Sequence, residues 1–161
     1  MIELLSIRAG TRAIQIIQDE GLKISRVKVL AGASGSAKFL VLTGIDRALV
    51  SLFSGRKDPL YLLGTSIGAF RMAAFCQPDP LTAIQQLETA YIDQQYSLNP
   101  TPAEIADGTR RILDAYIDDR QIKDLLGHPF MRINFLSSRC KGPMTSDHPL
   151  CQWGAMALAA G

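Results

Sequence analysis

The sequence feature that most constrains the fold is an apolar run that meets Gly-x-Ser-x-Gly and passes directly into a helix-forming segment. The run covers residues 60–63, the motif covers residues 64–68, and the segment after it covers residues 69–73. A strand that turns sharply into a helix around a serine is a nucleophile elbow. Glycines at 64 and 68 let the neighbouring backbone pass without a Cβ clash, and the turn exposes the hydroxyl group of Ser66. The amides after Ser66 lie at a helix N-terminus, where they favour a developing oxyanion.

The segments before this motif predict a βαβ unit. Residues 24–31 alternate and are rich in β-branched side chains, which predicts the first strand. A turn of small residues follows at 32–38, and an apolar helix is predicted over 39–53. The second strand then leads into the Gly-x-Ser-x-Gly motif. The 47% content of hydrophobic residues is enough to bury parallel strands on both faces, so the sequence predicts an α/β fold with a mainly parallel sheet.

The remaining segments predict further helices and one more strand. Helices are predicted over 11–20, 81–96, 102–116, 118–127 and 150–160, and a third strand over 131–139. Thr101 as the cap, Pro102 at the first position and Glu104 at the third predict the start of one of these helices. A sheet of three strands leaves exposed edges, which a homodimer or a further part of the domain would cover.

The turn at residues 32–38 has three interpretations. Its spacing resembles a phosphate-binding loop, but Ala37 replaces the second glycine and Phe39 replaces the hydroxyl group that would hold Mg²⁺. It is also consistent with a tight strand-to-helix connection whose small residues serve packing. The third interpretation is an oxyanion loop whose backbone N–H groups face Ser66. Neighbouring parallel strands end at the same sheet edge, and this favours the third interpretation.

The turn and the elbow together resemble the patatin-like phospholipases. The turn at residues 34–39 matches the glycine-rich pattern of that family at Gly35 and Lys38, and the elbow at residues 64–68 matches completely. The resemblance covers mainly residues 27–75. It implies a three-layer α/β/α fold, lipid or ester acyl hydrolysis, a Ser-Asp dyad and transient contact with a membrane surface. It assigns Ser66 as the nucleophile and the amides around Ser34, Gly35 and Ser36 as the oxyanion hole.

The general base for Ser66 is not evident in the sequence. The family's base is an aspartate in an Asp-Gly motif on a later strand, but Asp107-Gly108 lies within a predicted helix and is not assigned. His128 and His148 each precede a proline and are interpreted as surface loop residues. Lys38 is expected to pair with Asp46 or to bond a loop carbonyl. The three cysteines show no disulfide or metal spacing and are interpreted as buried thiols.

The end of the sequence bears on this question. Residues 153–161 form an apolar segment with no polar tail, and such a segment normally needs a partner. The expectation is that residues 1–161 are the N-terminal portion of a single domain and that the dyad aspartate lies beyond residue 161. The fragment by itself would then have little activity.

Composition excludes several other classes. The net charge of +2 comes from interspersed Lys and Arg, so no nucleic-acid partner is expected. No secretory signal occurs, and no apolar run reaches the ~18 residues of a membrane span. The protein is expected to be cytoplasmic. No cluster of His, Asp or Glu has ligand spacing, and neither a metal nor a cofactor is expected.

Two alternatives to the Ser-Asp hydrolase remain open. One is a non-catalytic α/β interaction module, in which the two motif glycines serve packing and Ser66 caps the following helix. The other is a Ser-His-Asp esterase or acyltransferase, which requires a histidine close to Ser66.

Overall fold

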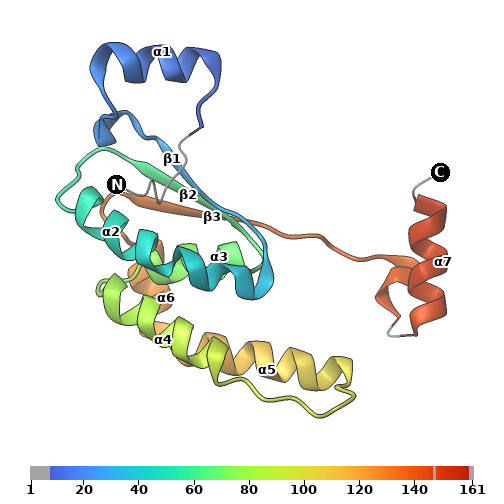
Figure 1. Cartoon of the computed structure of the whole chain (residues 1–161). Helices are drawn as coiled ribbons and strands as arrows, with labels where there is room; N and C mark the ends of the chain where they lie inside the picture. The colour runs from blue at the N-terminus through green and yellow to red at the C-terminus, as the bar shows by residue number, and fades with distance from the viewer. Residues whose placement is uncertain (1–7, 147, 160–161) are drawn as a thin grey trace.

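A small parallel sheet with helices packed against one of its faces makes up the computed structural model, which describes residues 8–146 and 148–159 (Figure 1). The strands are β1 (Val29–Gly32), β2 (Leu60–Thr65) and β3 (Met131–Leu136). The helices are α1 (Thr11–Glu20), α2 (Thr43–Phe53), α3 (Ile67–Phe75), α4 (Pro80–Ile92), α5 (Pro102–Asp114), α6 (Asp119–Leu126) and α7 (Pro149–Ala159). Short 3-10 helices cover η1 (Ile24–Arg26), η2 (Ser36–Leu42) and η3 (Gly142–Thr145).

The three strands are parallel and lie in the order β1-β2-β3. Gly32 is opposite Gly64, and Thr65 is opposite Leu136, so the carboxyl ends of the strands meet at one edge of the sheet. The predicted α/β class with an incomplete, parallel sheet is therefore confirmed. The turn after β1 and Ser66 after β2 both leave the sheet at this edge.

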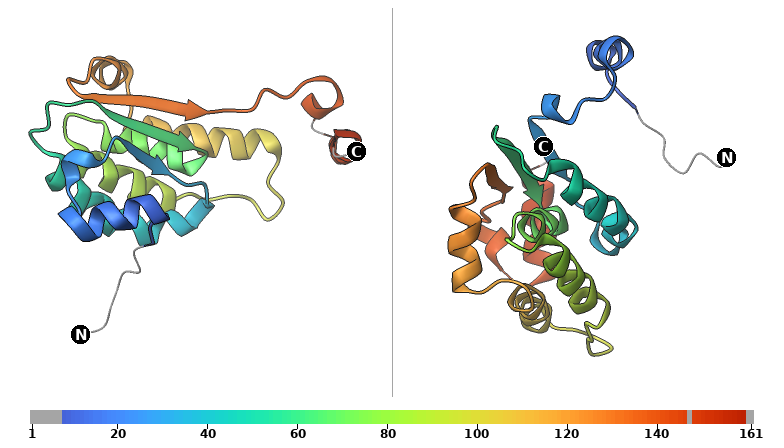
Figure 2. Two further views of the ribbon diagram at one scale, coloured as in Figure 1. Left: turned by 90° about the horizontal axis from the view of Figure 1, so that it is seen from above. Right: turned by 90° about the vertical axis from the view of Figure 1, so that its left-hand side faces the viewer.

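The hydrophobic core lies between one face of the sheet and the helices. Helix α3 packs across the three strands, and α4 packs against α3 and α2. Figure 2 shows α2, α3 and α4 on the same side of the sheet. The largest fully buried side chains in this core come from β2, α2, α3 and the residue after it, α4 and the segment after α5: Leu60, Leu62, Phe53, Met72, Phe75, Cys76, Leu87 and Tyr116. The elbow helix α3 thus lies at the centre of the core.

The opposite face of the sheet is open in the described part of the chain. Val29 and Tyr61 lie on this face and are about half exposed. Helix α1 buries none of its side chains, and α7 with η3 stands apart from the sheet (Figures 1 and 2). The apolar side chains of α7, such as Trp153 and Leu158, are exposed.

Several element boundaries differ from the predicted ones. The strand predicted over 24–31 is formed only at β1, because its pairing begins where Val29 meets Tyr61 and the residues before it have no neighbouring strand. For the same reason β3 ends at Leu136, where the pairing with β2 ends, instead of continuing to 139. The helix predicted over 39–53 begins as the 3-10 helix η2, and the helix predicted over 81–96 ends at Ile92.

The predicted helix start at residue 101 is confirmed. The Thr101 hydroxyl group accepts the N–H of Glu104 at 3.2 Å, and Pro102 is the first helical residue. The Glu104 carboxylate bonds back to Ser97 instead, at 2.6 Å from its backbone nitrogen and 2.8 Å from its hydroxyl oxygen. This contact ties the loop after α4 to the start of α5.

Candidate active site

Ser66 occupies a strained turn between β2 and α3. Its backbone has φ 51° and ψ −133°, which is far from the ψ of the left-handed helical region that L-residues tolerate. The side chain is exposed and makes no capping hydrogen bond to the amides of α3. The Ser66 carbonyl accepts the N–H of Ala69 at 2.8 Å. The serine hydroxyl group therefore projects from the turn and is not used to cap the helix.

Three glycines allow the close approach that creates this turn. A Cβ atom on Gly68 would lie 2.0 Å from the carbonyl oxygen of Gly32, and one on Gly64 would lie 2.5 Å from the Cα atom of Ala69. A Cβ atom on Gly32 would in turn lie 2.6 Å from the Gly68 carbonyl oxygen. The end of β1 thus contacts the first turn of α3 backbone to backbone, and this contact places the turn after β1 beside the elbow.

Ser36 begins η2 in the turn after β1 and is also strained. Its φ is 51°, and Ser36 and Ser66 are the two non-glycine residues with positive φ in the described part of the chain. Both line one cavity of about 470 Å³. Strained backbone of this kind gathers at functional sites. The structure therefore brings together two of the predicted site residues.

Apolar side chains form most of the wall of this cavity. Phe70 belongs to α3, Tyr91 belongs to α4, and Tyr96 lies in the loop before α5. Gly108 leaves room for Tyr96, because a Cβ atom there would lie 2.5 Å from the tyrosine oxygen. The remaining wall residues are Ile67, Gln94, Ile105, Thr109 and Ile112. In the sequence, the apolar wall residues show the ordinary spacing of a helix face that packs into a core. That spacing did not identify them as part of a site.

The other two predicted oxyanion residues lie in the turn but do not line the cavity. Ser34 is exposed, and Gly35 is half-buried directly before η2. The Gly35 carbonyl accepts the N–H of Lys38 at 3.2 Å. Ile67 does line the cavity and is the first residue of α3. The N–H of a first helical residue has no acceptor within its own helix, so the Ile67 amide is available to a ligand.

None of the residues that line the cavity carries a carboxylate or an imidazole group. Asp107 is 58% exposed on α5 and pairs with Arg110 at 2.7 Å, which agrees with its interpretation as a solvated helical carboxylate. It lies two residues after Ile105 and therefore about 200° around the helix from that wall residue. His148 is exposed beside α7. His128 precedes β3, roughly 20 Å from Ser66 along the strands.

His128 lies in the loop between α6 and β3, as predicted, but its imidazole has a structural role there that the sequence did not indicate. The side chain is half-buried, and its Nδ1 atom accepts the N–H of Met131 at 2.9 Å and that of Phe130 at 3.3 Å. Burial, and secondarily the positive charge of Arg132, lower the pKa of His128 below its ordinary value. The imidazole is thus a neutral acceptor that shapes the start of β3.

Two further expectations need correction. Lys38 does not pair with Asp46, because the buried Asp46 carboxylate receives both hydrogen bonds of the Arg71 guanidinium group. Of the cysteines only Cys76 is buried, and burial raises the pKa of its thiol to about 12. Cys140 and Cys151 are exposed because they lie outside the core, in the segment after β3 and on α7.

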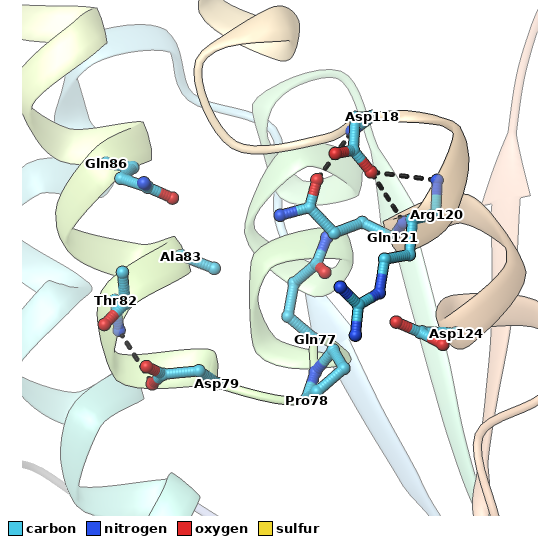
Figure 3. Close-up of a pocket in the computed structure, with 10 residues that line it drawn as sticks. All are labelled: Gln77, Pro78, Asp79, Thr82, Ala83, Gln86, Asp118, Arg120, Gln121 and Asp124. Carbon is cyan, nitrogen blue, oxygen red and sulfur yellow. Dashed lines mark hydrogen bonds between the residues drawn. The ribbon is translucent and has the colours of Figure 1, made fainter.

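A second cavity, of about 310 Å³, lies at the other end of α3 (Figure 3). Its carboxylates include Asp79, which accepts the N–H of Thr82, and Asp118, which accepts the N–H groups of Arg120 and Gln121. Both carboxylates therefore cap helices. Gln77 is 3% exposed, and its Oε1 atom has no hydrogen-bond partner within the described residues. No predicted site residue lines this cavity, so the elbow cavity remains the candidate active site.

No protein-family model, curated protein or solved structure matches this chain. Within residues 8–146 and 148–159, no helix combines the length and the apolar composition of a membrane span. The same residues contain no group of three His, Cys, Asp or Glu side chains that would hold a metal ion.

Proposed function

We propose that this protein is a serine acyl hydrolase that acts on lipid or carboxylic esters in the cytoplasm, with Ser66 as its nucleophile. One observation carries the proposal: a serine with φ 51° between a parallel strand and a helix, whose hydroxyl group caps nothing and opens on a cavity. A capping serine would adopt an extended backbone and accept an N–H of the first helical turn. The conformation of Ser66 therefore favours the nucleophile over the interaction module.

In the proposed reaction the Ser66 oxygen attacks the carbonyl carbon of the ester. Its proton passes to a general base, the carbonyl oxygen becomes the oxyanion, and the bond to the alcohol breaks as the alcohol takes up the proton. Water then hydrolyses the acyl-serine and releases the acid. The amides of Ile67 and of the turn at residues 34–36 are the proposed oxyanion donors. The apolar cavity wall suits the hydrocarbon part of an acyl group.

The general base of the proposal is an aspartate that is not among the residues lining the cavity. Among the described residues, neither a carboxylate nor an imidazole group lines the cavity, so the choice of a Ser-Asp dyad over a Ser-His-Asp triad rests on the resemblance of residues 27–75 to the patatin-like phospholipases. A serine without its base is a weak nucleophile, so a chain that lacks the base is expected to react slowly.

Labelling with a fluorophosphonate probe tests the proposal. We expect phosphonylation at Ser66, located by peptide mass spectrometry, in this chain or in any longer natural form of it, and none in the Ser66→Ala variant. Ser6, Ser54 and the other serines of the chain serve as internal controls in the same digest. If Ser66 is unlabelled in every form tested, the hydrolase proposal fails and the non-catalytic module is the better interpretation.

A further inference from the structure

We propose that Tyr91 is a positioning residue, whose hydroxyl group holds Ser36 and the turn after β1 in the conformation that faces Ser66. This inference rests on the proposed function, because it gives the turn a role in the reaction of Ser66. Its starting point is the backbone of Ser36, whose φ of 51° is unfavourable for a residue with a Cβ atom. Such a conformation persists only where the surrounding contacts enforce it.

Tyr91 makes two contacts with this turn. Its hydroxyl oxygen lies 3.0 Å from the Oγ atom of Ser36, within hydrogen-bond distance. Its ring meets the ring of Phe39 edge to face, with the centroids 5.0 Å apart. Phe39 is 2% exposed and lies three residues after Ser36 in η2, so the two residues share a face of this 3-10 helix. One tyrosine thus holds both the start and the middle of η2.

The helix that carries Tyr91 is itself tied to the helix that follows the turn. Glu88 lies three residues before Tyr91 on α4 and accepts a hydrogen bond from the Thr43 hydroxyl group of α2 at 3.1 Å. Glu88 also forms an ion pair with Arg47 of α2. The hydrogen bond from Arg47 is the largest cause that lowers the pKa of Glu88, so this carboxylate stays charged at neutral pH. These contacts fix α4 relative to α2, and they therefore hold Tyr91 in place beside the turn.

The link to reactivity is the direction of the Ser36 amide. The angle φ sets the direction of the backbone N–H of Ser36 relative to its side chain. If Tyr91 holds the Ser36 hydroxyl group in place, the N–H can therefore point in fewer directions. Ser36, Tyr91 and Ser66 line the same cavity. If the hydroxyl contact is lost, Ser36 is expected to relax toward negative φ and to turn its amide away from the oxyanion.

The test compares Tyr91→Phe with Tyr61→Phe by the kinetics of fluorophosphonate labelling at Ser66. Tyr61 also carries a phenol group, but it lies on the open face of the sheet, about half exposed, and does not line the cavity. We expect Tyr91→Phe to lower the maximal labelling rate about tenfold, the size of one well-placed hydrogen bond, with the probe concentration for half-maximal rate unchanged. Tyr61→Phe should label at the wild-type rate, and both variants should keep the thermal midpoint, because both keep their rings.

A double-mutant cycle with Ser36→Ala completes the test. Adding Tyr91→Phe to Ser36→Ala should cause no further loss, because the partner hydroxyl group is already absent. The inference is overturned if Tyr91→Phe labels like the wild type, if Tyr61→Phe lowers the labelling rate as much, or if the effects of Ser36→Ala and Tyr91→Phe simply add. In each of these cases, labelling of Ser66 in the wild-type protein still supports the hydrolase proposal. If the wild-type Ser66 is unlabelled in every form of the chain, both proposals fall.

Discussion

Arg71 and Asp46 form a buried, two-pronged ion pair between α3 and α2. Nε of Arg71 donates to Oδ2 of Asp46 at 2.8 Å, and a terminal nitrogen donates to Oδ1 at 2.7 Å. Asp46 is 3% exposed and Arg71 is 8% exposed. The pair joins the elbow helix to the helix that follows the turn after β1, so it fixes the two loops of the candidate site relative to each other.

Removing one member of this pair should destabilise the protein strongly. Arg71→Met leaves the Asp46 carboxylate buried without its partner, and we expect a loss of about 3–5 kcal/mol in the free energy of unfolding, measured by urea denaturation. The double variant Arg71→Met, Asp46→Leu removes both charges and should recover most of this loss. Equal destabilisation by the single and double variants would contradict the account of the pair as a desolvated charge contact.

Gly68→Ala should prevent the elbow from forming. The new methyl group would lie 2.0 Å from the carbonyl oxygen of Gly32, and the nearest atoms that it would meet all belong to the backbone, so a main-chain segment would have to shift. We expect a loss of at least about 3 kcal/mol in the free energy of unfolding, or no folded protein at all.

Gly44→Ala is the matched control for this variant. Gly44 lies on α2, and a Cβ atom there would have no neighbour within 4 Å among the described residues. Because alanine favours the helix over the unfolded chain, Gly44→Ala should raise the free energy of unfolding by about 0.5–1 kcal/mol. A folded Gly68→Ala protein with wild-type stability would show that the close approach of β1 and α3 is not required.

Ser66→Gly should be more stable than Ser66→Ala. Both variants lack the hydroxyl group, but glycine has no Cβ atom and adopts the φ of 51° without strain. We expect the glycine variant to exceed the alanine variant by about 1 kcal/mol in the free energy of unfolding. The measurement is a pair of urea titrations, and an alanine variant that equals or exceeds the glycine variant would count against strain at the elbow.

Acid should weaken the protein through His128. Burial and the charge of Arg132 lower the pKa of His128 in the folded state. The imidazole therefore binds a proton more readily in the unfolded chain than in the folded one. Stability is therefore lost as the pH falls below the ordinary histidine pKa of about 6.5. His128→Asn keeps a side-chain acceptor near the two N–H groups but does not titrate. Its free energy of unfolding should change less than that of the wild type between about pH 6.5 and 5.

The local elements around the elbow could be predicted from the sequence because their signals lie within a few residues. The apolar run before Gly64, the helix formers after Gly68 and the capping sequence at Thr101 act through neighbouring backbone atoms. The ends of the strands could not be predicted in this way. Where β1 begins and where β3 ends depends on the length of β2, which lies in another part of the chain.

The sequence by itself determined that Ser66 stands on a strand-to-helix turn between two glycines, since that depends on residues 60–73 alone. Tertiary structure alone decided which side chains surround it. Tyr91 reaches Ser36 across 55 positions, and Arg71 in place of Lys38 takes the carboxylate of Asp46. These contacts depend on how α2, α3 and α4 pack over the sheet. This packing depends on many weak apolar contacts between residues that are far apart in the chain, so it cannot be predicted from any short stretch of sequence.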